Sequence, residues 1–267
     1  MKKYKGAVLV TGAFGGMGRA TVDALSERGY KVYALDRSVG EGSEGVVPVA
    51  CDITDEEAVK SAFSEVSQME EGLDAIIHFA GIYILDSLVE MENEAFERIF
   101  KVNVQGAYLV NKMFLPLLKR PSRIIMTTSE LAPLDPLPFT GIYAVTKGAL
   151  DKYAYSLRME LQLLDIDVCV LRAGAVATEM LGVSTDHLDR FCRETKLYSC
   201  NAERFKSIVD SVEARSISPE RIAKKIVSIL EKKRTSFAYS INRNPLLLLL
   251  NALPDRLQVF IIKQILK

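Results

Sequence analysis

The sequence predicts an α/β protein built on a doubly wound parallel sheet, and three observations support this fold class. An apolar run at residues 7–10 leads into the glycine cluster Gly12, Gly15, Gly16 and Gly18, after which apolar residues recur at helical spacing. Strand-like and helix-like patterns then alternate along most of the 267 residues. The strand-like runs are almost continuously apolar, as parallel strands covered by helices on both faces are.

Each element can be assigned in chain order. Strands are expected at residues 7–10, 31–36, 46–51, 73–81, 124–129, 166–171 and 236–241. Helices are expected between Gly18 and Gly29, from a cap at Thr54 or Asp55, over 94–119 with a disturbance near Pro116, over 141–164, and from Ser218 onward.

Two segments depart from this alternation. Residues 175–216 are polar and charged, and in a doubly wound sheet they would stand above the carboxyl ends of the strands, where ligands bind. We expect a mostly helical insertion that covers the substrate. The predicted organisation is a single Rossmann-like catalytic domain at 1–243, with the insertion at about 175–216, and a hydrophobic, amphipathic C-terminal tail at 244–267.

Three arrangements of the tail remain open: it packs over the substrate pocket, is buried in a subunit interface, or lies on a membrane surface. We favour the first two, because amphipathic helices are ordinary core elements. Asp255 and Arg256 interrupt the apolar run, so no membrane-spanning helix is expected.

The composition restricts the function classes. The chain carries 34 basic and 34 acidic residues, which gives no electrostatic footprint for a nucleic-acid partner. Hydrophobic residues make up 49% of the chain and support a large core. The four cysteines show neither metal-ligand nor redox spacing. We therefore expect no metal site and a cytoplasmic protein, with membrane association through the tail as the alternative.

The glycine cluster has the context of a phosphate-binding loop. Glycines let the backbone approach a pyrophosphate, and the following helix offers free N–H groups to it. Taken alone, this loop is a weak signal, and a flexible turn is the alternative. Asp36, 18 residues beyond Gly18, lies near the spacing at which an acidic residue meets the adenosine ribose.

Four further residues indicate chemistry. Tyr143 and Lys147 share one face of a predicted helix, and a cation beside a tyrosine lowers a pKa that is about 10 in the free side chain. Ser129 ends a predicted strand, and Asn103 lies in Val-Asn-Val-Gln-Gly. Together with the glycine loop, and in this order, these motifs resemble the short-chain dehydrogenase/reductase family from about residue 6 to residue 239.

The resemblance implies a Rossmann-type fold and hydride transfer between nicotinamide and a secondary alcohol or ketone. It assigns Tyr143 as general acid and base, Ser129 as a hydrogen-bonding partner of the substrate oxygen, and Lys147 as a partner of the tyrosine and of the nicotinamide ribose. It places Asn103 in support of a water-linked proton relay. It also implies a homodimer or homotetramer, built partly from the helices around Asn103 and Tyr143.

The resemblance also indicates the cofactor site. The residues expected to contact the cofactor lie in the glycine loop, at strand ends and on the catalytic helix: Gly12, Phe14, Gly15, Gly16, Met17, Gly18, Asp36, Arg37, Cys51, Asp52, Ile53, Phe79, Ala80, Gly81, Asn103, Tyr143, Lys147, Gly174, Val176 and Thr178. Asp36 would repel a 2′-phosphate, so we expect NAD rather than NADP. Arg37 is a signal in the opposite direction.

The substrate is expected at Ser129, Leu131, Leu137, Tyr143 and Met180. Their apolar character suggests a hydrophobic, steroid-like or retinoid-like alcohol or ketone, as in the similar hydroxysteroid and retinol dehydrogenases of the family. Two alternatives remain. One is a non-catalytic dinucleotide-binding sensor, and the other is a sugar-nucleotide epimerase or dehydratase of related fold.

The chain departs from the family pattern at three places. His78 and Phe79 stand where many members have two asparagines, and we expect His78 to be a buried, hydrogen-bonded histidine rather than a metal ligand. Ala173 replaces a proline, which leaves the following turn less rigid. The spacing from Ser129 to Tyr143 is one residue longer than expected, so we expect a difference in the shape of the substrate pocket rather than in the chemistry.

Overall fold

Seven parallel strands form one sheet at the centre of the molecule. The computed structural model describes residues 4–213 and 215–267; the side chains of 180–187 and 212–213 lie outside that description. The strand order is β3-β2-β1-β4-β5-β6-β7, and each pair is parallel. Their bounds are β1 (Gly6–Thr11), β2 (Tyr30–Asp36), β3 (Val46–Ala50), β4 (Leu73–His78), β5 (Leu118–Ser129), β6 (Ile166–Ala173) and β7 (Ala238–Ile241).

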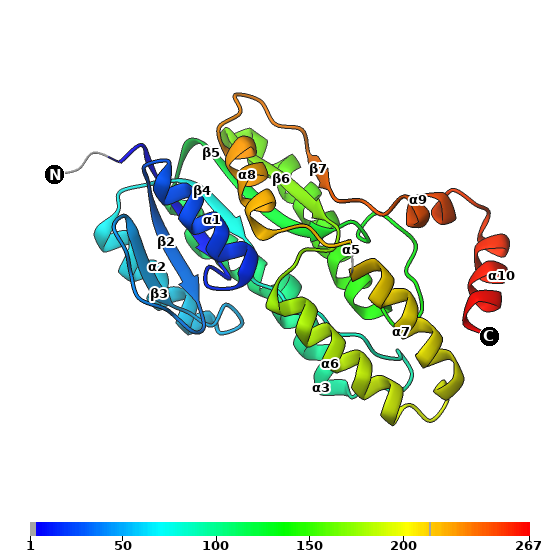
Figure 1. The fold of residues 1–267 in the computed structure, drawn as a ribbon. Coiled ribbons are helices and arrows are strands. Elements are labelled where there is room, and N and C mark those ends of the chain that lie inside the picture. Colours follow the sequence, from blue (N-terminus) through cyan, green and yellow to red (C-terminus); the bar gives the residue numbers. More distant parts are fainter. Residues whose placement is uncertain (1–3, 214) are drawn as a thin grey trace.

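Helices cover both faces of the sheet, which confirms the predicted doubly wound α/β fold (Figure 1). On one face α1 (Gly16–Glu27) packs against α8 (Pro219–Leu230), over a core that includes Val8, Ile77 and Ile226. On the other face lie α2 (Glu56–Met69), α4 (Gly106–Phe114) and α5 (Gly141–Leu161). The strand order reverses between β1 and β4, and ligands bind at such switch points.

The expected helix over 94–119 is interrupted, and this expectation was wrong. The segment consists of α3 (Asn93–Phe100), a π-helical turn (Lys101–Gln105), α4, and a 3-10 turn (Leu115–Leu117). Asn103 lies in the π turn and hydrogen-bonds the backbone of Ile82 instead of a neighbouring helical turn. After the 3-10 turn, β5 begins at Leu118, six residues before the expected start.

The predicted insertion is helical. It consists of α6 (Glu179–Glu194) and α7 (Ser199–Glu213), which lie side by side beyond the sheet in Figure 1. A separate apolar cluster joins this pair to the loop before α5, with Phe139, Leu188, Phe191 and Phe205 among its members. Phe139 has a left-handed backbone (φ 62°) and its ring contacts the rings of Phe191 and Phe205.

The C-terminal tail forms two further helices, α9 (Pro245–Asn251) and α10 (Asp255–Leu266), drawn in red in Figure 1. Asn244 caps α9 by accepting a hydrogen bond from the Leu246 N–H at 3.0 Å. Leu266 of α10 is buried in the cluster with Phe205. Within the described part of the chain, no helix is both long enough and apolar enough to cross a membrane.

Candidate active site

The glycine loop requires its glycines for steric reasons. Gly12 has φ +64°, and a Cβ atom there would lie 2.5 Å from the backbone nitrogen of Ala80. A Cβ at Gly18 would lie 1.9 Å from the carbonyl oxygen of Gly12, and one at Gly16 would lie 2.7 Å from Thr178 Cγ2. The loop therefore folds tightly between β1 and the start of α1 and leaves an open cradle, which fits the phosphates of a dinucleotide.

A cavity of about 580 Å³ opens at this cradle. Its lining includes most of the residues that the sequence assigned to the cofactor: Gly12, Phe14, Gly15, Gly16, Met17, Gly18, Asp36, Arg37, Cys51, Asp52, Ile53, Phe79, Ala80, Gly81 and Thr178. Tyr143, Gly174 and Val176 line a neighbouring cavity instead, and Asn103 and Lys147 are buried beneath Gly81. The volume suits a ligand of cofactor size.

Two carboxylates are fixed in the cofactor cavity. Asp36, at the end of β2, accepts hydrogen bonds from the Phe14 N–H at 3.0 Å and the Ser38 N–H at 3.4 Å. Asp52 accepts from the Thr54 N–H at 2.9 Å and the Thr54 hydroxyl at 2.7 Å. These donors hold the pKa of Asp52 below its usual value. Both groups therefore present oriented acceptors to a ligand.

Tyr143 and Lys147 lie one turn apart on α5, as their spacing predicts. The Lys147 ammonium lies 5.7 Å from the centre of the Tyr143 ring and donates a hydrogen bond to the Thr127 carbonyl at 3.3 Å. Burial lowers the pKa of Lys147 to about 8. A Cβ on Gly81 would lie 3.3 Å from this ammonium, so the loop after β4 passes close over it.

The pKa of Tyr143 differs from the sequence expectation. Apolar surroundings raise it to about 12, and a hydrogen bond with Ser129 opposes that shift. In the protein alone, burial therefore outweighs the lowering of the Tyr143 pKa that was expected from Lys147. Tyr143 is therefore a protonated phenol at neutral pH.

Asn103 joins three segments from its place in the π turn. Its Oδ1 accepts from the Ile82 N–H at 2.8 Å, and its Nδ2 donates to the Ile82 carbonyl at 3.0 Å and to Thr146 Oγ1 at 3.1 Å. π turns frequently mark functional positions in helices. Asn103 thus ties the loop after β4 to α5, beside Lys147.

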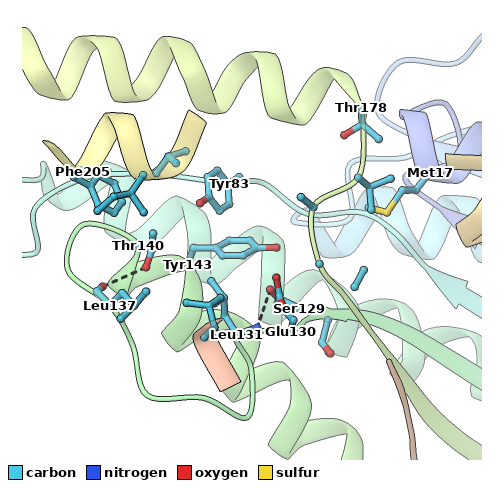
Figure 2. A pocket seen from close by; sticks show the side chains of 18 residues that line it. Met17, Tyr83, Ser129, Glu130, Leu131, Leu137, Thr140, Tyr143, Thr178 and Phe205 are labelled. Atoms are coloured by element: carbon cyan, nitrogen blue, oxygen red, sulfur yellow. Dashed lines mark hydrogen bonds between the residues drawn. The ribbon is translucent and has the colours of Figure 1, made fainter. Parts of the chain in front are cut away.

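A second cavity, of about 210 Å³, opens beside Tyr143. Figure 2 shows the Tyr143 hydroxyl pointing toward the side on which Met17 and Thr178 lie, and these two residues and Tyr83 line both cavities. Ser129, Leu131, Leu137 and Tyr143 line it, as the sequence suggested; the side chain of Met180 lies outside the described residues. The rest of its lining is Thr128, Glu130, Thr140, Ala173, Gly174, Ala175, Val176, Phe205, Ile208, Val209 and Leu247.

The sequence analysis did not predict several of these lining residues. The Tyr83 ring meets the Tyr143 ring edge-to-face, with centroids 4.4 Å apart. Phe205, Ile208 and Val209 come from α7, and Leu247 from α9. The run of five leucines was a sequence signal for Leu247, but no local pattern shows which of the five leucines faces the cavity.

His78 is buried and hydrogen-bonded, as expected. Its Nε2 lies 2.9 Å from Asn111 Oδ1, and burial lowers its pKa to about 4. The side chain is 3% exposed, so a neutral ring links β4 to α4 in the core.

Comparison with known proteins agrees with this geometry. The short chain dehydrogenase family model matches residues 6–189. A probable short-chain type dehydrogenase/reductase of Helicobacter pylori, VdlC, is 29% identical over 254 residues, covering 92% of this chain and 93% of that protein. The 3-ketodihydrosphingosine reductase of Bacteroides thetaiotaomicron is 26% identical over 271 residues, 96% of each.

Two further comparisons concern a vertebrate relative and a solved structure. Estradiol 17-beta-dehydrogenase 2 of Mus musculus is 32% identical over 203 residues, 70% of this chain and 52% of that protein. The crystal structure of 3-ketoacyl-(acyl-carrier-protein) reductase from Brucella melitensis complexed with NADH has the same fold, with a TM-score of 0.73, 23% identity, and coverage of 89% and 97%. Since the family model spans most of the sheet and the Ser129–Lys147 region, the chain belongs to the short-chain dehydrogenase/reductase family, NAD(P)-binding oxidoreductases that act on CH–OH and ketone groups.

Proposed function

We propose that this enzyme interconverts a hydrophobic secondary alcohol and the corresponding ketone, with NAD as its preferred cofactor and Tyr143 as its proton donor and acceptor. One observation carries the proposal most directly. Tyr143 lines a small, mainly apolar cavity, and its hydroxyl points toward Met17 and Thr178, which also line the cavity suited to a dinucleotide. A reacting carbon held there would face the cofactor on one side and the tyrosine on the other.

The proton transfer follows from the side chains around Tyr143. A bound nicotinamide supplies the hydride for ketone reduction and accepts it for alcohol oxidation. During reduction the Tyr143 hydroxyl donates its proton to the carbonyl oxygen, and the Ser129 hydroxyl donates a hydrogen bond to the same oxygen. The phenolate left behind is stabilised by the Lys147 ammonium. Asn103 keeps the Ile82 loop and α5 in register during this exchange.

The protonation state of Tyr143 supports reduction as the direction for which the protein is prepared. With a pKa of about 12, the phenol carries its proton at neutral pH and is ready to donate it. Alcohol oxidation requires the phenolate first. A second positive charge from oxidised nicotinamide would favour that phenolate.

The lining of the smaller cavity supports a hydrophobic substrate. Leu131, Leu137, Phe205, Ile208 and Leu247 contribute aliphatic and aromatic surface around Tyr143. The names of the relatives that act on dihydrosphingosine and estradiol derivatives are consistent with such a substrate. Apolar area of this kind stabilises a bound ligand by about 25 cal/mol for each Å² that is buried.

Replacing Tyr143 with Phe tests the proposal. The ring would still pack against Tyr83, but the proton donor would be lost, so kcat for ketone reduction should fall about 100- to 10,000-fold while NADH affinity is unchanged. Tyr155→Phe is the matched control, because Tyr155 is on the same helix and is 51% exposed. Near-normal turnover by the Tyr143 variant would refute the assignment. A wild-type protein that binds cofactor but turns over no ketone or alcohol would favour a non-catalytic sensor.

A further inference from the structure

The small apolar cavity contains one buried carboxylate that the proposed reaction does not use. Among the described residues that line this cavity, Glu130 alone carries a charge, and it is 6% exposed. It follows Ser129 directly in the chain, at the end of β5. Figure 2 shows Glu130 beside Ser129, across the cavity from Tyr83.

Few protein groups offset the cost of burying the Glu130 carboxylate. Within residues 4–213 and 215–267, its hydrogen bond is from the Asn244 N–H to Oε2 at 2.6 Å, and no ion pair to it is found. Arg243 is exposed and acts on it only through space. Burial raises the pKa of Glu130, as expected for a carboxylate that lacks a close cation.

The position of the carboxylate is set by a turn that itself lines the cavity. A Cβ on Gly174 would lie 3.0 Å from Glu130 Oε1, so the carboxylate lies directly against this glycine. Gly174 and Ala175, which follow β6, line the same cavity as Leu247 of α9. Glu130 therefore lies in the wall of the cavity, next to Ser129 in the chain and in contact with the start of the tail at Asn244.

The hydrogen bond to the tail does not explain why residue 130 has a carboxylate side chain. The Asn244 N–H needs only an acceptor, and the neutral amide of glutamine would serve. An ionised glutamate is rarely buried without a paired cation, because removing it from water is costly. The charge is compensated if the ligand in the cavity brings a cation of its own.

We propose that Glu130 binds a protonated amino group on the substrate. This inference rests on the proposed function and narrows its substrate class to hydrophobic amino ketones and amino alcohols. Ser129 and Glu130 line the same cavity, so a substrate whose oxygen is held by Ser129 would present an amino group on a nearby carbon to Glu130. The alkyl part then lies along Phe205, Ile208 and Leu247.

The test compares two long-chain alkyl ketones that differ only in an amino group on the carbon beside the carbonyl. At pH 7 we expect the wild-type enzyme to reduce the amino ketone with a higher kcat/KM than the plain ketone. In Glu130→Gln, which keeps an acceptor for Asn244, this preference should fall about 10- to 100-fold, because a charge-assisted hydrogen bond becomes a neutral one. The kcat/KM for the plain ketone should fall by much less than that for the amino ketone, because the plain ketone carries no cation for Glu130 to bind.

Asp135→Asn is the matched control. Asp135 also fastens the tail, by accepting from Asn251 Nδ2 at 2.6 Å and Gln258 Nε2 at 3.2 Å, but it does not line the cavity. This variant should keep the amino preference. Equal losses for both ketones in Glu130→Gln, or an unchanged preference, would overturn the proposal and leave Glu130 as a tail anchor.

A binding measurement separates this inference from the proposed reaction. A long-chain alkylamine should bind the NADH-loaded wild-type protein more tightly than the matching alkyl alcohol, and Glu130→Gln should remove that difference. Calorimetry gives both affinities without turnover. If the amine is bound through Glu130 and no ketone is reduced, the proposed function fails while the amine site stands. Equal affinities for amine and alcohol in the wild-type protein would refute the amine site.

Discussion

Burial shifts the pKa values of Tyr143 and Lys147 in opposite directions, and each shift bears on the proposed reaction. The pKa of Tyr143 rises to about 12 and that of Lys147 falls to about 8, since burial favours the neutral form of each side chain. Below pH 8 the pair is a neutral phenol beside an ammonium, which is the state that donates a proton and stabilises the resulting phenolate.

This pairing predicts a pH dependence. The kcat/KM for ketone reduction should be level below about pH 8 and decline above it, because Lys147 loses the charge that stabilises the Tyr143 phenolate. A pH–rate profile with a non-ionising ketone measures this decline. Lys152→Met, which removes an exposed lysine from the same helix, should leave the profile unchanged. A level profile up to pH 10 would contradict the role of Lys147.

We expect Asp36 to determine the choice between NAD and NADP. Asp36→Asn keeps an acceptor for the Phe14 N–H but removes the charge that would face a 2′-phosphate. Two unit charges about 4 Å apart interact by about 4 kcal/mol near a protein surface, so the ratio of kcat/KM for NADP to that for NAD should rise at least about tenfold. Asp23→Asn, at an exposed position on α1, is the control. A wild-type enzyme that already prefers NADP tenfold would refute the assignment.

At the level of elements, regular patterns were predictable and interruptions were not. All seven strands were expected, because apolar runs between turn signals are a local property. The π turn at Asn103 was missed, since the hydrogen bonds of Asn103 to Ile82 and Thr146 link residues 21 and 43 positions apart. The early start of β5 likewise depends on pairing between Leu118 and Leu73.

The two cavities show the same contrast. Most of the cofactor cavity comes from strand ends and the glycine loop, whose roles follow from sequence order and steric need. The smaller cavity is closed by Tyr83, Phe205 and Leu247, which belong to a loop and two helices far apart in the chain. Their meeting depends on how α7 and α9 pack, and no periodicity in the sequence encodes that packing.

At the scale of the whole molecule, the exposed apolar side chains of α4, α5 and the tail bear on association. Tyr108, Val145 and Met159 are exposed on the α4–α5 side, each by at least 43%. Exposed apolar patches of this kind mark association surfaces. They support the expected homo-oligomer through these helices, which remains a prediction. The tail presents a second surface, with Leu246, Leu249 and Val259 each exposed by at least 64%.

The tail is therefore divided between an inner and an outer face, and the two faces predict different effects. Leu247 lines the smaller cavity, whereas Leu249 on the same helix is 64% exposed. Leu247→Ala should raise the KM for a long-chain ketone and leave NADH affinity unchanged. Leu249→Ala should change neither value, and steady-state kinetics with both variants measures the difference.

Deleting residues 244–267 extends this argument to the whole tail. The deletion removes Leu247 from the cavity, the Asn244 hydrogen bond from Glu130, and Leu266 from the cluster around Phe205. The truncated protein should therefore be less soluble, have an altered oligomeric state by light scattering, or have a higher KM for the ketone. NADH should still bind, because no tail residue lines the described cofactor cavity. If the full chain sediments with liposomes and the truncated chain does not, the exposed leucines bind a lipid surface. The membrane alternative would then replace the packing role that we favour.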